Sequence, residues 1–159
     1  MNRITILDDI IRKPQEYLYN ILEGEFTNIE DGPNVFKGIQ PRPNYDEFGA
    51  FVTSFLDNRY KINYNFIRKS PLGQIEPNFI HTDEMMGELT AILYLSEEHP
   101  IEDGTTFYDD DENKMGIVYS KFNRMILFDS KTKHSRNIFV NFGEGNRARI
   151  IQVAFLSKI

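Results

Sequence analysis

The chain has 159 residues and a formal net charge of −6, which suits one compact domain with a real core. It contains no cysteine, and this excludes disulfides, thiolate metal sites and cysteine nucleophiles. The acidic charge argues against nucleic acid as a partner, because proteins that bind duplexes usually carry a broad basic field.

The sequence shows neither an export signal nor a membrane span. Residues 1–4 lack the long apolar core of a signal peptide. No apolar run approaches the roughly 18 residues that cross a bilayer. We therefore expect neither secretion nor membrane insertion, with a cytoplasmic location as the default expectation.

The N-terminal part is expected to begin with a strand and a helix. Residues 4–7 form a short apolar run that can be a first strand. Pro14 can occupy a first helical turn, where its missing N–H is not needed. Apolar residues at helical spacing follow until Gly24, a natural stop. The pattern predicts a helix over residues 14–23.

A second helix is expected after a proline-rich break. Residues 35–39 form a short strand candidate, and residues 40–43 read Gln-Pro-Arg-Pro, in which the prolines exclude a regular helix or a central strand. Asn44 with Glu47 three residues later is typical of a helix start. Apolar residues on one helical face then predict a helix over residues 45–57.

From residue 60 onward the sequence has β character. Short β-prone runs alternate with turn residues, at 60–68, 79–83, 89–95, 105–108, 115–119, 124–128, 134–142 and 149–156. Eight strands at this spacing, without intervening helices, favour a sandwich or jelly roll over a parallel sheet. We predict one mainly β (α+β) domain over residues 1–159, in which residues 1–59 give helical support to a jelly-roll core over 60–156.

Two histidines and one aspartate are candidate metal ligands. Alternate side chains of an extended strand share a face, so His81 and Asp83 point the same way. His134 opens a run whose alternate residues are apolar, which suits a histidine at the mouth of an apolar barrel. Two imidazoles and one carboxylate can occupy one face of an iron coordination sphere and leave the other open for substrates. These three residues are therefore the predicted metal ligands and catalytic residues of an iron(II)-dependent oxygenase.

Alternatively, His81 and Asp83 form a hydrogen-bonded pair at the surface, because the motif His-x-Asp occurs often by chance. The chain has only three histidines, and two of them fall at strand ends in the β-rich region. The third, His99, precedes a turn and is interpreted as exposed and structural. This distribution favours the metal site.

Arg149 is a candidate anion-binding residue. It opens the last apolar run, and both faces of that run are mostly apolar. A buried guanidinium is costly unless it is paired, and its planar fork suits a carboxylate in two-point contact. The partner can be an anionic ligand or one of the 24 acidic residues of the chain. Arg147, two residues earlier, would lie on the same strand face as Arg149. It lies nearer the turn, however, where a solvated position is favoured.

At these residues the chain resembles the iron(II)/2-oxoglutarate-dependent oxygenases, particularly the prolyl-hydroxylase-like branch. Five stretches within residues 60–156 resemble the family's motifs in the same order, and they lie at 81–83, 89–95, 103–108, 123–129 and 145–151. They correspond to the His-x-Asp motif, the strand after it, a Gly-Gly-x-Thr-x-Phe turn, the strand before the distal histidine, and the closing strand with the basic partner.

The resemblance implies a double-stranded β-helix with His81, Asp83 and His134 as iron(II) ligands. It implies an arginine that binds the distal carboxylate of the co-substrate 2-oxoglutarate, with Arg149 preferred over Arg147. Thr106, by its motif position, is expected near the co-substrate. The spacing of 15 residues from His134 to Arg149 is longer than is common in prolyl hydroxylases, so both arginines stay candidates.

Three functional hypotheses compete. The resemblance implies a hydroxylase of a protein side chain or a small molecule that releases succinate and CO2. A second hypothesis is a non-catalytic β-sandwich binding module, in which Arg149 pairs internally. A third is an oxygenase that modifies nucleic-acid bases, and the acidic net charge counts against it. Substrate identity and oligomeric state stay open.

Overall fold

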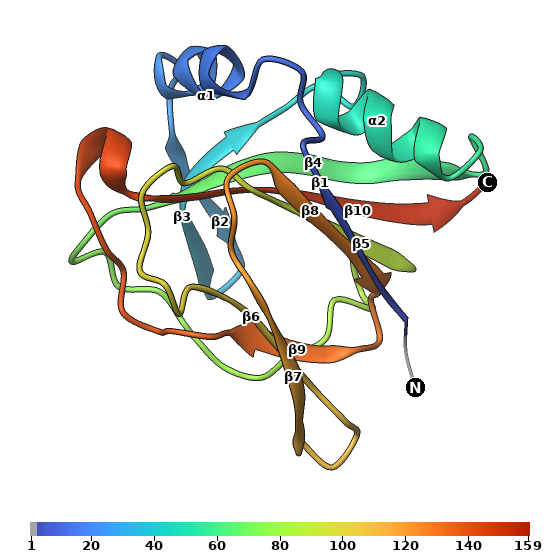
Figure 1. Ribbon diagram of the computed structural model, residues 1–159. Helices are drawn as coiled ribbons and strands as arrows, with labels where there is room; N and C mark the ends of the chain where they lie inside the picture. Colours follow the sequence, from blue (N-terminus) through green and yellow to red (C-terminus); the bar gives the residue numbers. More distant parts are fainter. Residues whose placement is uncertain (1–2) are drawn as a thin grey trace.

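The computed structural model describes residues 3–159 (Figure 1). Its first elements are β1 (Ile4–Asp8), α1 (Pro14–Leu22), β2 (Thr27–Asp31), β3 (Asn34–Pro41) and α2 (Glu47–Phe55). The later strands are β4 (Tyr60–Ser70), β5 (Leu89–Tyr94), β6 (Gly104–Tyr108), β7 (Lys114–Tyr119), β8 (Arg124–Asp129), β9 (Lys133–Arg136) and β10 (Arg149–Lys158), with one 3₁₀ turn at Gly145–Arg147. Of residues 1–4, which lack the apolar core of a signal peptide, residues 1–2 lie outside the described part of the chain.

The strands form two antiparallel sheets packed against each other. The larger sheet has seven strands in the order β1-β8-β5-β10-β4-β3-β2, and the smaller has the order β7-β6-β9. A single bridge between His81 and His134 adds one more chain segment beside β9. The chain crosses repeatedly between the sheets, since β5, β8 and β10 lie in the larger one and β6, β7 and β9 in the smaller. This arrangement is a jelly roll and confirms the predicted fold class.

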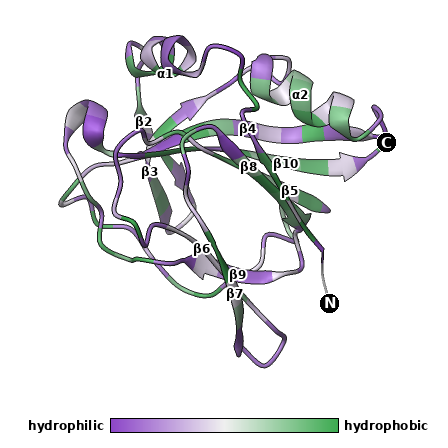
Figure 2. Ribbon diagram, in the orientation of Figure 1, coloured by the Kyte–Doolittle hydropathy of each residue, from purple (hydrophilic) through white to green (hydrophobic). Residues whose placement is uncertain are grey.

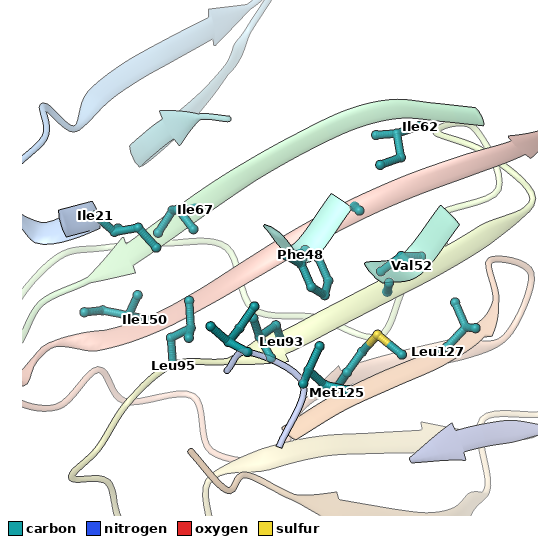
Figure 3. Packing of buried hydrophobic residues seen from close by; sticks show 14 of the residues in the cluster. Ile21, Phe48, Val52, Ile62, Ile67, Leu93, Leu95, Met125, Leu127 and Ile150 are labelled. Atoms are coloured by element: carbon teal, nitrogen blue, oxygen red, sulfur yellow. The ribbon is translucent and has the colours of Figure 1, made fainter. Parts of the chain in front are cut away.

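The larger sheet separates two hydrophobic cores. One core lies between this sheet and the helices, where Phe48 of α2 packs near Leu93 of β5 (Figure 3). The other lies between the sheets and includes Phe107 and Phe128. Successive side chains of a strand point to opposite faces, so one strand such as β5 contributes to both cores. Apolar residues are accordingly concentrated in the larger sheet, whereas the connection from β6 to β7 is polar (Figure 2).

The two helices are short. Each has nine residues, and α1 begins at Pro14 and ends at Leu22, in agreement with the predicted helix over 14–23. In the described part of the chain, no helix combines the length and the apolar character needed to cross a membrane.

The start of α2 was predicted incorrectly. The N-cap is Asp46, whose side chain accepts a backbone N–H of the first turn at 2.9 Å. The sequence pattern predicts Asn44 as the cap and a helix over residues 45–57, whereas the helix spans Glu47–Phe55. The amide of Asn44 instead donates to the backbone oxygen of Ile62 at 3.2 Å, so it stabilises the contact with β4. Asn44, although suited to cap a helix, therefore makes a tertiary contact with β4 instead.

Two strand predictions also differ from the structure, and one strand of the structure was not predicted. Within the run 79–83 only His81 pairs, through a single bridge. The run 134–142 ends as a strand at Arg136, because the apolar residues beyond it, such as Val140 at 74% exposure, face solvent and not a core. Strand β2 was missed because all five of its residues are exposed, so it lacks the alternation that marks a half-buried strand.

A buried carboxylate joins both helices to the larger sheet. One oxygen of Asp46 accepts hydrogen bonds at 3.0, 3.1 and 2.9 Å from Tyr17, Arg42 and Gln152. The other oxygen caps α2 and accepts from Asn65 at 3.1 Å. A single side chain thus connects α1, α2, β4 and β10.

Replacing Asp46 with alanine is expected to lower the free energy of unfolding by about 3 kcal/mol, because it removes an N-cap and leaves buried donors without an acceptor. Urea unfolding measures the loss. The exposed Asp31→Ala variant is the control and should change stability by less than about 0.5 kcal/mol. A loss below about 1 kcal/mol for Asp46→Ala would show that the network is not structural.

Candidate metal centre

Three side chains from distant parts of the sequence converge beside the inter-sheet core. His81 and Asp83 precede β5, and His134 lies on β9. One potential ligand atom from each lies within 4.8 Å of the others, and within residues 3–159 these are the only histidine and carboxylate side chains grouped in this way. The carboxylate of Asp83 is 3.1 Å from Nε2 of His134 and 3.5 Å from Nε2 of His81.

Backbone hydrogen bonds hold the three residues together. The N–H of His81 donates to the carbonyl of His134 at 3.0 Å, and the N–H of His134 donates back at 2.9 Å. This reciprocal pair is the hydrogen-bonded unit of an antiparallel ladder. The N–H of Asp83 donates to the carbonyl of Ser130 at 2.8 Å. The His-x-Asp segment is therefore fixed against β9 and the turn that precedes it.

Both imidazoles direct the same nitrogen at the centre. Nδ1 of His81 lies 3.0 Å from the carbonyl oxygen of Phe79, and Nδ1 of His134 lies 2.9 Å from that of Thr132. A carbonyl only accepts, so each Nδ1 carries the proton and the neutral ring offers the Nε2 lone pair to a metal. The ring of Phe128 stands edge-on to His134 at 4.9 Å between centroids and covers it.

Asp83 is ionised and held in position. The hydroxyl of Thr90 donates to its carboxylate at 3.1 Å. Without a metal, Nε2 of each imidazole can also carry a proton and donate it to Asp83 in a hydrogen bond. Burial raises the pKa of Asp83, but these hydrogen bonds from His134 and His81 outweigh that effect, and the pKa lies well below its ordinary value. The hydrogen bond with Asp83 in turn raises the pKa of His81, against the opposing effect of burial.

Arg149 lies in the interior and forms an ion pair. Its side chain is 4% exposed, and its partner Asp103 is 1% exposed. Nε of Arg149 donates to the carboxylate of Asp103 at 3.0 Å. The sequence predicted that a buried Arg149 needs an anion, but it could not indicate this aspartate among the 24 acidic residues.

Two other candidate residues lie away from the three ligands. Arg147 is in the 3₁₀ turn, with its side chain 77% exposed and 3.7 Å from Glu98. The hydroxyl of Thr106 donates to the side chain of Asn137 at 2.8 Å. Because adjacent residues of a strand face opposite sides, Thr106 points away from the interior and Thr105 points into it. Arg147 therefore lies at the surface, and Thr106 faces Asn137 on the side of β6 opposite to Thr105.

Tyr94 and Thr105 are interior polar residues that sequence reasoning missed. The hydroxyl of fully buried Tyr94 lies 2.6 Å from that of Thr105. Burial raises the pKa of Tyr94 to about 12, although the bond to Thr105 and the charge of Arg149 oppose this. A tyrosine inside an apolar strand was the available signal, since its hydroxyl needs a partner when buried.

Solved structures share this architecture, although no family model and no curated protein matches the sequence. The α-ketoglutarate-dependent epimerase SnoN from nogalamycin biosynthesis is 13% identical with a TM-score of 0.64, over 96% of this chain and 75% of SnoN. A Pseudomonas putida prolyl-4-hydroxylase is 14% identical with a TM-score of 0.62, over 100% and 94%. A Trichoplax adhaerens prolyl hydroxylase is 16% identical with a TM-score of 0.61, over 96% and 82%. The chain has the fold of the iron(II)/2-oxoglutarate-dependent oxygenases.

The donor set within this oxygenase fold fits iron(II). Two neutral imidazoles and one carboxylate make up the facial set typical of non-haem iron(II) oxygenases and leave further positions open. The carbonyl partners of both Nδ1 atoms orient the rings, as the outer partners of metal-bound histidines usually do. The resemblance found in the sequence is confirmed at the level of the fold.

Three arginines gather on the inner faces of β4, β9 and β10, namely Arg68, Arg136 and Arg149. Buried Glu76 lies 2.9 Å from Nε of Arg68 and 4.0 Å from Nη1 of Arg136. Burial, with the charge of Arg149 adding to it, lowers the pKa of Arg136 to about 10, so its guanidinium stays charged at neutral pH. Arg68 and Arg136 were not predicted as site residues.

Metal affinity is expected to fall as the pH decreases through the pKa of His81. A metal binds the neutral imidazole, so protons compete with it. The hydrogen bond with Asp83 raises the pKa of His81 above 6.5 in the metal-free protein, so the competition begins at a higher pH than for an ordinary histidine. Calorimetric titration with Mn(II) between about pH 6 and 8 measures this. An affinity that is constant over that range would contradict it.

Proposed function

We propose that this protein is an iron(II)- and 2-oxoglutarate-dependent dioxygenase that hydroxylates a protein side chain or a small molecule. The observation that carries the proposal is the convergence of His81, Asp83 and His134 within 4.8 Å. It occurs in a fold shared with 2-oxoglutarate oxygenases. A fold alone hosts many functions, so the argument rests on the chemistry of these side chains.

The proposed ligands act through atoms that are already oriented. His81 and His134 supply Nε2, and Asp83 supplies a carboxylate oxygen. Thr90 donates to Asp83 and bonds Ser130 at 2.9 Å, which keeps the carboxylate in one orientation. When bound, iron(II) and 2-oxoglutarate would supply the oxidative chemistry, in which one oxygen atom of dioxygen enters succinate as 2-oxoglutarate loses CO2 and the other hydroxylates the substrate.

Arg149 is the proposed partner of the distal carboxylate of 2-oxoglutarate. Asp103 binds its Nε, which fixes the plane of the guanidinium and leaves the terminal amino groups to act as donors to a ligand. The neutral hydroxyls of Tyr94 and Thr105 lie in the same interior. The surface position of Arg147 supports Arg149 as the residue that performs this role.

Apolar side chains cover the inner face of the larger sheet, which includes the strand β10 that carries Arg149. Val153 and Ile92 are paired in register on β10 and β5, and Phe66 on β4 faces Val153. Val153 and Ile92 are buried in the core between the sheets, and Phe66 is partly buried against it. Such a lining excludes water and strengthens the electrostatic contacts of a charged co-substrate.

We propose a protein side chain or a small molecule as the substrate, without choosing between the two classes. Among the similar structures, the Trichoplax adhaerens enzyme is in complex with a hypoxia inducible factor peptide fragment, and SnoN is in complex with nogalamycin RO. In this chain Phe79 and Phe139 are 59% and 52% exposed on two loops joined by a hydrogen bond from Asn78 to the carbonyl of Phe139 at 3.1 Å. Phe79 also packs on the ring of His81 at 5.4 Å between centroids. The exposed rings of Phe79 and Phe139 can therefore contact an apolar part of a substrate.

The test is release of succinate. Purified protein loaded with iron(II) is supplied with oxygen, 2-oxoglutarate and pools of peptides or metabolites. We expect succinate in amounts that depend on the pool and that disappear when a chelator removes the metal. Folded, iron-loaded protein that forms no succinate with any pool would exclude the enzymatic function.

A non-catalytic β-sandwich binding module is the second candidate. The observation in its favour is the ion pair between Arg149 and Asp103, which gives Arg149 a structural role without any ligand. Thermal unfolding with Mn(II) and 2-oxoglutarate separates the two functions. Ligands that bind only the folded state at a hundred times their Kd stabilise it by about 2.7 kcal/mol. An unchanged melting temperature would support the binding module.

A further inference from the structure

The guanidinium of Arg136 has buried donors without acceptors. Among residues 3–159, no acceptor forms a hydrogen bond with its Nε or Nη2, and both atoms are shielded from solvent. Its Nη1 donates to the side-chain oxygen of Asn141 at 2.6 Å, which anchors the group. A buried cationic donor without a partner is costly. The free edge of Arg136 is therefore suited to an anionic ligand.

The charges around Arg136 also favour an anionic ligand. Arg149 pairs with Asp103 at 3.0 Å, whereas Arg68 and Arg136 share Glu76 at 2.9 and 4.0 Å. Three guanidinium groups against two carboxylates leave one net positive charge in this cluster. Arginine does not lose its proton in proteins, so the excess charge is removed only by an anion.

The position of Arg136 relative to the metal centre also suits a ligand that spans from the metal to Arg136. It is two residues from His134 on β9, and alternate residues of a strand share a face. Two residues of strand rise about 6.6 Å, which is comparable with the length of a five-carbon keto diacid. Across the smaller sheet Arg136 is in register with Thr105, whose hydroxyl contacts that of Tyr94. Arg136 thus borders the same interior as Arg149.

We propose that Arg136 binds the distal carboxylate of 2-oxoglutarate together with Arg149, so that the co-substrate lies between guanidinium groups from β9 and β10. Nε and Nη2 form one edge of a planar fork, and this edge matches the two oxygens of a carboxylate. The inference rests on the proposed function, because it assigns a further binding residue to the same co-substrate.

The charge count favours the co-substrate over the substrate as the source of this carboxylate. Iron(II) against Asp83 leaves one positive charge, which the keto acid carboxylate of 2-oxoglutarate offsets. The excess charge at Arg136 is then offset by the distal carboxylate. No cation of this cluster is then left unpaired.

The experiment compares two keto acids in Mn(II)-loaded protein by calorimetry. The first is 2-oxoglutarate, and the second is 2-oxovalerate, which has the same carbon chain with a methyl group in place of the distal carboxylate. We expect Arg136→Gln to weaken 2-oxoglutarate on the order of tenfold to a hundredfold, the usual effect of losing a charged hydrogen-bond partner, and to leave 2-oxovalerate unchanged. Arg147→Gln is the matched control, because Arg147 lies on the surface, and should change neither affinity.

The outcomes separate the inference from the proposed function. Wild-type protein that binds no 2-oxoglutarate with Mn(II) overturns both. Binding that Arg136→Gln leaves unchanged, or a loss of equal size for both keto acids, overturns the inference alone. Arg136→Lys is a second variant for the case in which Arg136→Gln does not fold. It keeps the charge but loses the fork, so it should weaken 2-oxoglutarate severalfold, and equal effects on both keto acids would again overturn the inference.

Discussion

Replacing His134 with alanine is expected to lower metal affinity by at least about a thousandfold. Loss of an outer hydrogen-bond partner of a metal-bound histidine already costs about tenfold to a hundredfold in affinity, and this change removes a proposed ligand itself. The fold should survive, because the bridge between His134 and His81 uses backbone atoms that alanine retains. The loss of binding will therefore report on the ligand and not on unfolding.

The measurement is an anaerobic titration with iron(II) and 2-oxoglutarate, followed through the visible charge-transfer band of the ternary complex. We expect the band in the wild-type protein and no band in His134→Ala. The matched control is His99→Ala, because His99 lies outside the centre with its Nδ1 2.9 Å from the carbonyl oxygen of Pro100. A band that persists in His134→Ala would show that the three side chains are not the metal ligands.

Replacing Arg149 with methionine is expected to lower the free energy of unfolding by about 4 kcal/mol, because it leaves the carboxylate of Asp103 buried without a counter-charge. Asp103 is 1% exposed, so water cannot replace the lost partner. Adding Asp103→Asn should recover at least half of the loss, since a neutral amide is less costly to bury than a carboxylate. Denaturant unfolding of the two variants measures both effects.

The double variant also separates a structural role of Arg149 from a binding role. If Arg149 holds the distal carboxylate of 2-oxoglutarate, the folded double variant should bind Mn(II) normally and 2-oxoglutarate on the order of a hundredfold more weakly. Arg147→Met should affect neither. Unchanged affinity for 2-oxoglutarate in the double variant would assign Arg149 a structural role only.

Local patterns determined the parts of the structure that depend on neighbouring residues. Pro14 and the apolar spacing after it predicted the first helix, because helix formation and capping involve residues three or four apart. The alternation of apolar residues likewise predicted most strands and the jelly-roll class. The pairing of His81 with Asp83 followed from the same short-range rule, since alternate residues of extended chain share a face.

The same local rules failed where a tertiary contact competed with them. Asn44 suited a helix cap, but its amide bonds to the backbone of β4. Local alternation also could not indicate whether Thr105 or Thr106 faces the interior, and the structure directs Thr105 toward Tyr94. A shift of one residue reverses the face of every side chain in a strand, and only the packed sheet shows which face is inside.

The residue types that the site needs were determined by the sequence, whereas their partners were decided by the tertiary structure. The sequence indicated that a buried Arg149 needs an anion, and the fold supplies Asp103, 46 positions away. The sequence contained Arg136 and Glu76 without any local signal for them, and the packing of β4, β9 and the loops between strands brought them together. The physical reason is that antiparallel register joins segments that are distant in the chain, and no local spacing encodes which of them will meet.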